Sequence, residues 1–228
     1  MGRDGPADLS AELTAVLPKD TRRAWSSLAS LLPRELYLAG GTAVAVHLHH
    51  RQSRDLDFFY HDSSVDLTQI EDTLSQAGAF AVRLRDAGTL RGTFGATKLE
   101  FFHADEGAPQ TLLDEPTEVE GLRVAGLRDL LAMKLKVVRE RGELRDYYDI
   151  KEIGERSGLS VEDGLVFFME RFGVSAHNPA IGQVVQGLGY LDDVEEDDSL
   201  PITKEDLAEW WATRQASLVR NLARNPLR

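Results

Sequence analysis

Two carboxylates stand two positions apart in the run Asp55-Leu56-Asp57-Phe58-Phe59, whose other residues are apolar, as is typical of a β-strand. Side chains i and i+2 of a strand share one face, roughly 7 Å apart. We therefore expect Asp55 and Asp57 on one face, with Leu56 and Phe58 directed into the interior. Neighbouring carboxylates repel each other, and a divalent cation is the simplest partner that makes such a pair favourable. The spacing thus predicts a metal site.

A third carboxylate follows on another predicted strand, residues 98–102, where Glu100 lies between apolar neighbours. With Asp55 and Asp57 it completes an acidic triad drawn from two strands. Phosphoryl and nucleotidyl transfer use such triads to hold two metal ions about 3.5–4 Å apart. One ion lowers the pKa of an attacking hydroxyl, and the other neutralises the triphosphate and the leaving pyrophosphate. The alternative is that Glu100 ends in solvent on one face of the sheet.

A glycine pair precedes the aspartates. Gly40 and Gly41 separate an apolar run, 36–39, from an Ala/Val-rich segment of helical composition that begins at Thr42. Glycines at a strand-to-helix turn let the backbone approach a phosphate closely, and the free N–H groups at a helix start attract anions. The alternative is an ordinary turn that needs a positive φ. The turn is no P-loop, because no Gly-Lys-Ser/Thr follows, and no dinucleotide fingerprint, because a third glycine is missing.

The elements that must position these residues change in character along the chain. Predicted strands cover 36–39, 55–59, 80–84, 89–94 and 98–102, and predicted helices cover 6–17, 21–32 (with Asp20 as N-cap) and 66–77. Later patterns are helical, at 127–141, 144–156, 161–172, 180–188 and 204–224, and Thr203 with Asp206 suits the start of the last helix. The predicted class is α+β, with an α/β head at 1–125 and an α-helical domain at 126–228.

Composition narrows the class of protein. The chain has 228 residues, of which 42% are hydrophobic and 28% charged, enough for one large core or two small domains of a soluble globular protein. It has no cysteine and hence no disulfide framework or thiolate zinc site. No apolar segment of signal-peptide or membrane-spanning length occurs, so we expect a cytoplasmic protein without membrane contact. A net charge of −12 argues against indiscriminate nucleic-acid binding but allows a local basic groove.

Two segments carry a resemblance to a known family. Gly40-Gly41-Thr42 followed by Arg51-Gln52-Ser53-Arg54-Asp55-Leu56-Asp57 resembles the first motif of AbiEii/AbiGii-type nucleotidyltransferase toxins, of the polymerase-β-like nucleotidyltransferase superfamily. Lys134, Arg141 and Arg145-Asp146-Tyr147-Tyr148-Asp149 are similar to the family's Lys…Arg…Arg-Asp-x-x-Asp segment. The matches span 36–150, about half the chain. The resemblance implies a polymerase-β-like head, with a mixed sheet flanked by helices, and an α-helical domain that completes the active-site cleft.

The same resemblance implies a role for each matching residue. Asp55 and Asp57 would bind Mg²⁺, and Glu100 would complete the metal site and accept the proton of the attacking hydroxyl; the third-carboxylate position varies in such proteins. Gly40, Gly41 and Ser53 would hold the nucleotide phosphates, with Arg51 nearby. Lys134 would contact the triphosphate, Asp149 would fix Lys134 or the nucleotide, and Arg145 would bind the nucleotide.

The spacing of Lys134 and Asp149 imposes a geometric condition. They are 15 positions apart, so on one straight helix they would stand roughly 22 Å from each other. We therefore predict two helices that turn near Gly142 and bring both residues to one site. The alternative is an exposed ion pair of Arg145 with Asp149, at i and i+4, worth only a few tenths of a kcal/mol.

Other clusters give weaker signals. Between 123 and 145 seven basic residues stand against three acidic ones, which suits a polyanionic substrate or a solvated helix face, and Arg83, Arg85 and Arg91 would extend the basic region. The acidic run 192–198 is expected to be a solvated linker. His47, His49 and His50 lack the spacing of a zinc site and are expected to finish the helix from Thr42. Of Trp210 and Trp211, we expect at least one in the core.

Two functions remain open. One is an Mg²⁺-dependent nucleotidyltransferase that moves a nucleoside monophosphate from an NTP to an acceptor hydroxyl. By resemblance it would be the toxin of a toxin–antitoxin pair, with a tRNA 3′ end as acceptor, a protein hydroxyl as the alternative, and a possible antitoxin partner. The other is a non-catalytic nucleotide- or antitoxin-binding module. The intact Asp55/Asp57 pair and Lys134 favour the enzyme, because a decayed site would usually lose a metal ligand.

Overall fold

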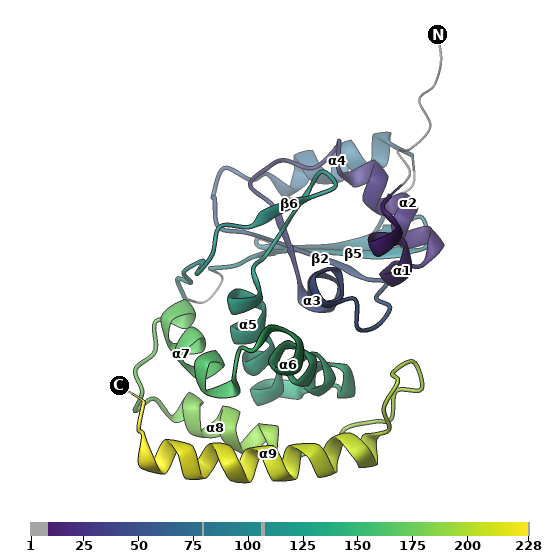
Figure 1. Ribbon diagram of the computed structural model, residues 1–228. Coiled ribbons are helices and arrows are strands. Elements are labelled where there is room, and N and C mark those ends of the chain that lie inside the picture. The colour runs from purple at the N-terminus through teal and green to yellow at the C-terminus, as the bar shows by residue number, and fades with distance from the viewer. Residues whose placement is uncertain (1–8, 79, 106–107, 228) are drawn as a thin grey trace. The chain divides into compact units, whose positions relative to one another are not determined.

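The chain is divided into two compact units, and it passes from one to the other at 109–110, 114–115 and 126–127. The computed structural model describes residues 9–78, 80–105 and 108–227, apart from the side chain of Arg141. The first unit comprises Met1–Pro109 and Glu115–Gly126, and the second comprises Gln110–Asp114 and Leu127–Arg228. Figure 1 shows the elements of both units in colours that follow the chain.

A mixed seven-stranded sheet forms the centre of the first unit within its described residues, in the order β3-β4-β5-β2-β1-β7-β6. The strands are β1 (Tyr37–Ala39), β2 (Leu56–Tyr60), β3 (Phe80–Arg85), β4 (Thr89–Phe94), β5 (Thr97–His103), β6 (Thr117–Val119) and β7 (Leu122–Val124). The central strand β2 pairs antiparallel with β1 and parallel with β5. The first five strands were predicted and are confirmed. The hairpin β6–β7 was not predicted, because three-residue strands are too short to show an alternating pattern.

Four helices accompany this sheet in the described residues: α1 (Ala11–Val16), α2 (Lys19–Leu28), α3 (Gly40–Leu48) and α4 (Leu67–Gln76). Helices α3 and α4 lie on opposite sides of the sheet (Figure 1). The N-cap prediction for Asp20 is wrong, because the carbonyl of Pro18 already accepts the N–H of Arg22 at 2.9 Å and starts the helix earlier. Of the first predicted helix, residues 6–8 lie outside the described part of the chain.

Alternation along β2 separates its core face from its polar face. Leu56, Phe58 and Tyr60 are buried, whereas Asp55 and Asp57 are half-buried on the opposite face. Phe58 stacks on Phe101 of β5 with ring centroids 5.4 Å apart, and such stacking adds to the energy of apolar burial. The core therefore holds β2 from one side and leaves its carboxylates facing the other way.

Five helices make up the second unit in its described residues: α5 (Leu127–Arg141), α6 (Leu144–Ser157), α7 (Val161–Phe172), α8 (Pro179–Leu188) and α9 (Lys204–Arg224). Each prediction is confirmed to within one residue. Thr203 caps α9 by accepting the N–H of Asp206 at 3.1 Å, as expected. Trp211 is fully buried and donates its indole N–H to the carbonyl of Tyr147 at 3.3 Å, which confirms a core role for one of the two tryptophans.

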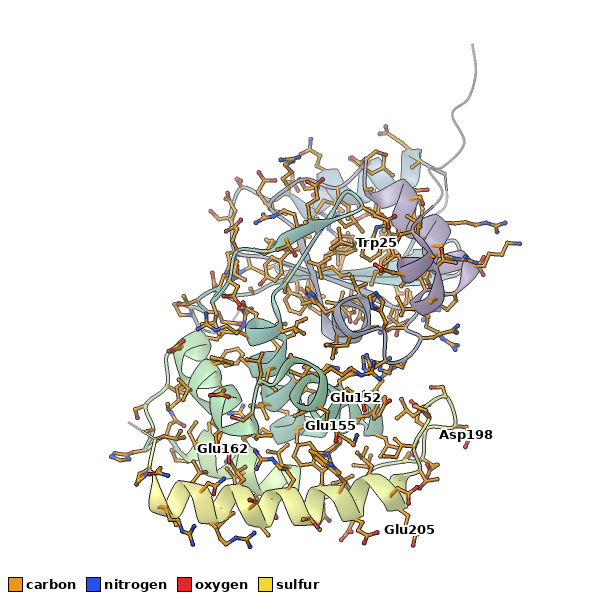
Figure 2. The ribbon with its side chains drawn as sticks, in the orientation of Figure 1. Trp25, Glu152, Glu155, Glu162, Asp198 and Glu205 are labelled. Atoms are coloured by element: carbon orange, nitrogen blue, oxygen red, sulfur yellow. The ribbon has the colours of Figure 1, made fainter. Side chains whose placement is uncertain are left out.

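In each unit, one side chain that Figure 2 labels joins two elements. Trp25 is fully buried in the first unit and donates to the carbonyl of Glu120 at 3.3 Å, which joins α2 to the β6–β7 turn. Glu162 accepts from Arg214 and Asn221, which joins α7 to α9 in the second unit.

The acidic run 192–198 is irregular and largely exposed, as predicted, but the side chain of Val194 within it is buried. None of the helices in the described ranges is long and apolar enough to span a membrane.

Candidate active site

The carboxylate of Asp57 lies directly against Gly40. Ala39, the last residue of β1, is the register partner of Asp57 on β2, and Gly40 follows with φ +69°. A Cβ atom at position 40 would stand 2.5 Å from Oδ2 of Asp57, closer than real atoms approach. Glycine is required here both for the left-handed backbone and for the space that the carboxylate fills. The structure thus brings the predicted phosphate-binding turn and a predicted metal ligand together.

The loop that leads into β2 is held by polar contacts. Oγ1 of Thr42, in the first turn of α3, lies 2.7 Å from Oγ of Ser53 and also contacts the carbonyl oxygen of Asp55. The backbone N–H of Ser53 donates to the carbonyl of Val16 at 2.9 Å. The side chain of Arg51 turns back on the loop and donates to the carbonyl of Gln52 at 3.0 Å. Ser53 and Asp55 therefore sit on a fixed backbone.

Glu100 is held beside Asp57 by two cations. It is the register partner of Asp57 in the parallel pair β2–β5, so the two side chains share one face of the sheet. Its Oε1 lies 3.3 Å from Nε of Arg91 and 3.2 Å from Nζ of Lys98. The side chain is only 13% exposed, so the alternative in which Glu100 ends in solvent is wrong. Lys98 stands two positions before Glu100 on β5, whereas the approach of Arg91 depends on the register of β4 with β5, which the spacing along one strand does not contain.

The carboxylates of the first unit would suit a magnesium site that a bound nucleotide would help to complete. Across the described residues, no group of three or more His, Cys, Asp or Glu side chains is arranged to hold a metal ion. Mg²⁺, however, is usually bound through one or two carboxylates together with waters and substrate phosphates, rather than by an all-protein cage. Asp55 and Asp57 offer such a pair. Glu100 lies on the same sheet face as Asp57, and both of its cations contact Oε1.

In the second unit, Lys134 meets Asp149 as predicted. Helix α5 ends at Arg141 and α6 begins at Leu144, so the predicted break near Gly142 is confirmed. The break brings Nζ of Lys134 to 2.7 Å from Oδ2 of Asp149 and to 2.6 Å from Oδ1 of Asp146. Lys134 and both carboxylates are buried. The alternative of an exposed pair between Arg145 and Asp149 is therefore wrong, and Arg145 is paired with Glu143.

Local sequence explains why the chain turns at this point. A Cβ at Gly142 would stand 2.6 Å from the ring of Tyr147, so only glycine lets this ring pack against the turn. Glu143 then caps α6, and Asp146 accepts the N–H of Glu143 at 3.0 Å while its other oxygen meets Lys134. Sequence reasoning gave Asp146 no role. The spacing Glu143-x-x-Asp146, which suits a capping box, was the signal that could have found it.

The basic stretch between 123 and 145 is largely compensated locally. In the first unit Arg123 pairs with Glu115. In the second, Arg128 pairs with Asp114 and Glu170, Arg139 with Glu140, and Lys136 lies over the ring of Phe172.

The predicted end of α3 is confirmed, since His49 caps it in a left-handed conformation. His47 is hydrogen-bonded to the carbonyl of Ala125 at 2.8 Å.

Known proteins share both the sequence pattern and the fold. The family model "Nucleotidyl transferase AbiEii toxin, Type IV TA system" matches residues 23–224. An uncharacterized protein of Aquifex aeolicus (strain VF5) is 26% identical over 199 residues, which is 86% of this chain and 90% of the relative. Among solved structures, JHP933 from Helicobacter pylori is similar with a TM-score of 0.55 and 18% identity, over 95% of this chain and 96% of that one. MenT4, a nucleotidyltransferase toxin from Mycobacterium tuberculosis H37Rv, is similar with a TM-score of 0.51 and 18% identity, over 92% and 86%.

Proposed function

The chain belongs to the AbiEii nucleotidyltransferase toxin family, and from this premise we propose that it transfers a nucleoside monophosphate from an NTP to an acceptor hydroxyl with Mg²⁺. The acceptor that we propose is a tRNA 3′ end, which the resemblance to the toxin group implies. The observation that carries the proposal is the contact of the Asp57 carboxylate with Gly40. It joins the proposed phosphate-binding turn to a proposed metal-binding carboxylate within one strand–helix–strand unit.

The residues of the first unit would divide the work of binding and orientation. Bound Mg²⁺ supplies charge neutralisation at the phosphates and a lowered pKa at an attacking hydroxyl. Asp55 and Asp57 would hold the ion through their oxygens. Gly40 and Gly41 open α3, whose first N–H groups would bind phosphate oxygens, and the Ser53 hydroxyl would donate to the same phosphates, with Arg51 nearby.

Glu100 is the proposed acceptor of the proton from the attacking hydroxyl and a proposed additional metal ligand. It shares a sheet face with Asp57 and is fixed by Arg91 and Lys98.

The residues of the second unit that match the family would act on the nucleotide. Lys134 is the proposed contact to the triphosphate, and Arg145 a further nucleotide-binding residue. Asp149 would hold the Lys134 ammonium in place, which its 2.7 Å contact supports. The proposed partner protein is a cognate antitoxin, and the proposed site of action is the cytoplasm, where NTPs and tRNA are present together.

A labelling experiment tests the proposal. Wild type would be incubated with Mg²⁺, each α-³²P-labelled NTP in turn, and either total tRNA or a protein extract. We expect label on tRNA with wild type. We expect no label when EDTA is present from the start of the reaction, and none with Asp57→Asn or Asp55→Ala. Label on protein instead would move the acceptor hydroxyl to a protein. Equal absence of label from wild type and from Asp55→Ala would identify a non-catalytic binding module.

A further inference from the structure

We propose that Thr42 and Thr21 are positioning residues for nucleotidyl transfer, because they fix the backbone that carries Ser53 and Asp55. The inference rests on the proposed function and extends it to two residues that bind no substrate. Thr42 is 1% exposed and Thr21 is 2% exposed, and the hydroxyl of each is bonded to a backbone carbonyl of the loop. Together with the carbonyl of Val16 they form what we call the loop clamp.

The hydroxyl of Thr42 has one proton and two partners. A carbonyl oxygen can only accept, so Thr42 donates to the carbonyl of Asp55 and accepts the proton of Ser53 across 2.7 Å. A phosphate would need that Ser53 proton, so nucleotide binding would exchange one bond of Ser53 for another. The bond from Thr42 to Asp55 needs no such exchange. Thr42 is thus suited to hold the metal-binding aspartate throughout turnover.

The other two members of the loop clamp come from the N-terminal helices. The hydroxyl of Thr21 in α2 donates to the carbonyl of Arg54 at 3.0 Å. The carbonyl of Val16, the last residue of α1, accepts the N–H of Ser53 at 2.9 Å. Successive backbone groups at 53, 54 and 55 are thereby bonded to three different helices. The loop is fixed at each residue between the proposed phosphate-binding serine and the proposed metal ligand.

Part of the loop clamp lies outside the residues that the family model matches. The family model matches residues 23–224, which includes Thr42 but neither Thr21 nor Val16. The N-terminal helices α1 and α2 would thus contribute to the geometry of the site through Val16 and Thr21. A misplacement of about 1 Å at a reacting group can cost roughly 10²-fold in rate, so contacts of this kind matter for kcat.

Removal of each hydroxyl with little change of volume tests the inference. Thr42→Val and Thr21→Val delete the donors, and Thr42→Ser restores the one at position 42. Thr97→Val is the matched control, because within the described residues the buried hydroxyl of Thr97, also in the first unit, has no hydrogen-bond partner. Each variant would be assayed for kcat and for KM of the NTP. Hydrogen exchange of amides 53–55 would be measured without nucleotide.

We expect Thr42→Val to lower kcat by roughly 10- to 100-fold with little change in KM, since the metal ligand moves while the phosphate contacts remain. Thr21→Val should have a smaller effect in the same direction, because it loses one bond at Arg54. Both should speed exchange at 53–55, whereas Thr97→Val and Thr42→Ser should resemble wild type. If Thr42→Val does not fold, Thr21→Val carries the test.

The outcomes distinguish a failure of this inference from a failure of the proposed function. An active wild type whose Thr42→Val and Thr21→Val variants match Thr97→Val in kcat and exchange overturns the inference alone. A fall in kcat that Thr42→Ser fails to rescue also counts against it, because the hydroxyl would then not be the responsible group. A wild type that transfers no nucleotide to RNA or protein refutes the proposed function, and the inference with it.

Discussion

Position 40 of the candidate site requires glycine for two reasons. Its φ of +69° is compatible with a few residue types at a cost, but the Asp57 carboxylate occupies the place of a Cβ. We expect Gly40→Ala to displace that carboxylate and to reduce nucleotidyl transfer by roughly 10²-fold or more. Transfer rates under saturating NTP and Mg²⁺ would measure the loss.

Gly95 supplies the control for backbone strain at position 40. It also has a positive φ, +60°, in a turn of the same unit, but nothing lies within 4 Å of the place where its Cβ would stand. Gly95→Ala should therefore lower the free energy of unfolding only by the cost of the left-handed backbone, about 1–2 kcal/mol, and leave nucleotidyl transfer unchanged. Equal activity of the two variants would show that the contact between Gly40 and Asp57 has no part in the reaction.

Among the elements, the turn between α5 and α6 depends on the packing of one ring against one glycine. Gly142→Ala would drive a methyl group into Tyr147, and overpacking of this kind costs typically 1–3 kcal/mol. The control is Gly182→Ala in the middle of α8, where nothing lies within 4 Å and alanine should stabilise the helix by up to about 1 kcal/mol. Urea unfolding would compare them. A Gly142→Ala variant as stable as wild type would show that the ring yields readily.

The ring of Tyr147 also makes α6 sensitive to alkaline pH. Burial, with a smaller effect of the Asp146 charge, raises the pKa of Tyr147 from 10.0 to about 12. A group whose pKa is raised on folding contributes stability that is fully present below its unfolded value and is lost as pH rises through the folded value. Stability should thus fall between about pH 10 and pH 12.

Tyr147→Phe isolates this alkaline loss from that of the other tyrosines. The hydroxyl lies 3.0 Å from the carbonyls of Gly187 and Tyr190, so the variant should be less stable than wild type at neutral pH. The difference should shrink as pH rises toward 12, because wild type alone has this proton to lose. Urea midpoints of both proteins across this range provide the measurement. A constant difference would contradict the raised pKa.

At the scale of the whole molecule, the sequence predicted elements better than the contacts between them. The long helices of the second unit have clear periodicity, and the core strands have marked alternation, so both were predicted closely. The start of α2 was missed because Pro18 and its carbonyl, rather than the side chain of Asp20, begin the helix. Glu100 was recognised as a carboxylate. Its contact with Lys98 agrees with their spacing of two along β5, whereas its contact with Arg91 follows from the register of β4 with β5, which spacing along one strand does not contain.

The segment Gln110–Asp114 is another feature that chain order conceals. It precedes the β6–β7 hairpin of the first unit, yet it packs within the second. Asp129 of α5 explains this arrangement, because its two carboxylate oxygens accept the backbone N–H groups of Leu113 and Asp114, each at 3.0 Å. Arg171 of α7 pairs with the same carboxylate, and both side chains are fully buried. A single buried ion pair thereby holds two helices and the segment together.

Loss of the arginine should leave a buried carboxylate uncompensated. We expect Arg171→Met to lower the free energy of unfolding of the second unit by about 3–5 kcal/mol and to speed hydrogen exchange at residues 111–114. Arg214→Met is the matched control, because it removes an ion pair with Glu162 whose members are 22% and 25% exposed. Partly exposed pairs contribute at most about 1 kcal/mol. Urea unfolding followed by tryptophan fluorescence would compare the two, and equal losses would mean that Asp129 is stabilised by its backbone donors without the arginine.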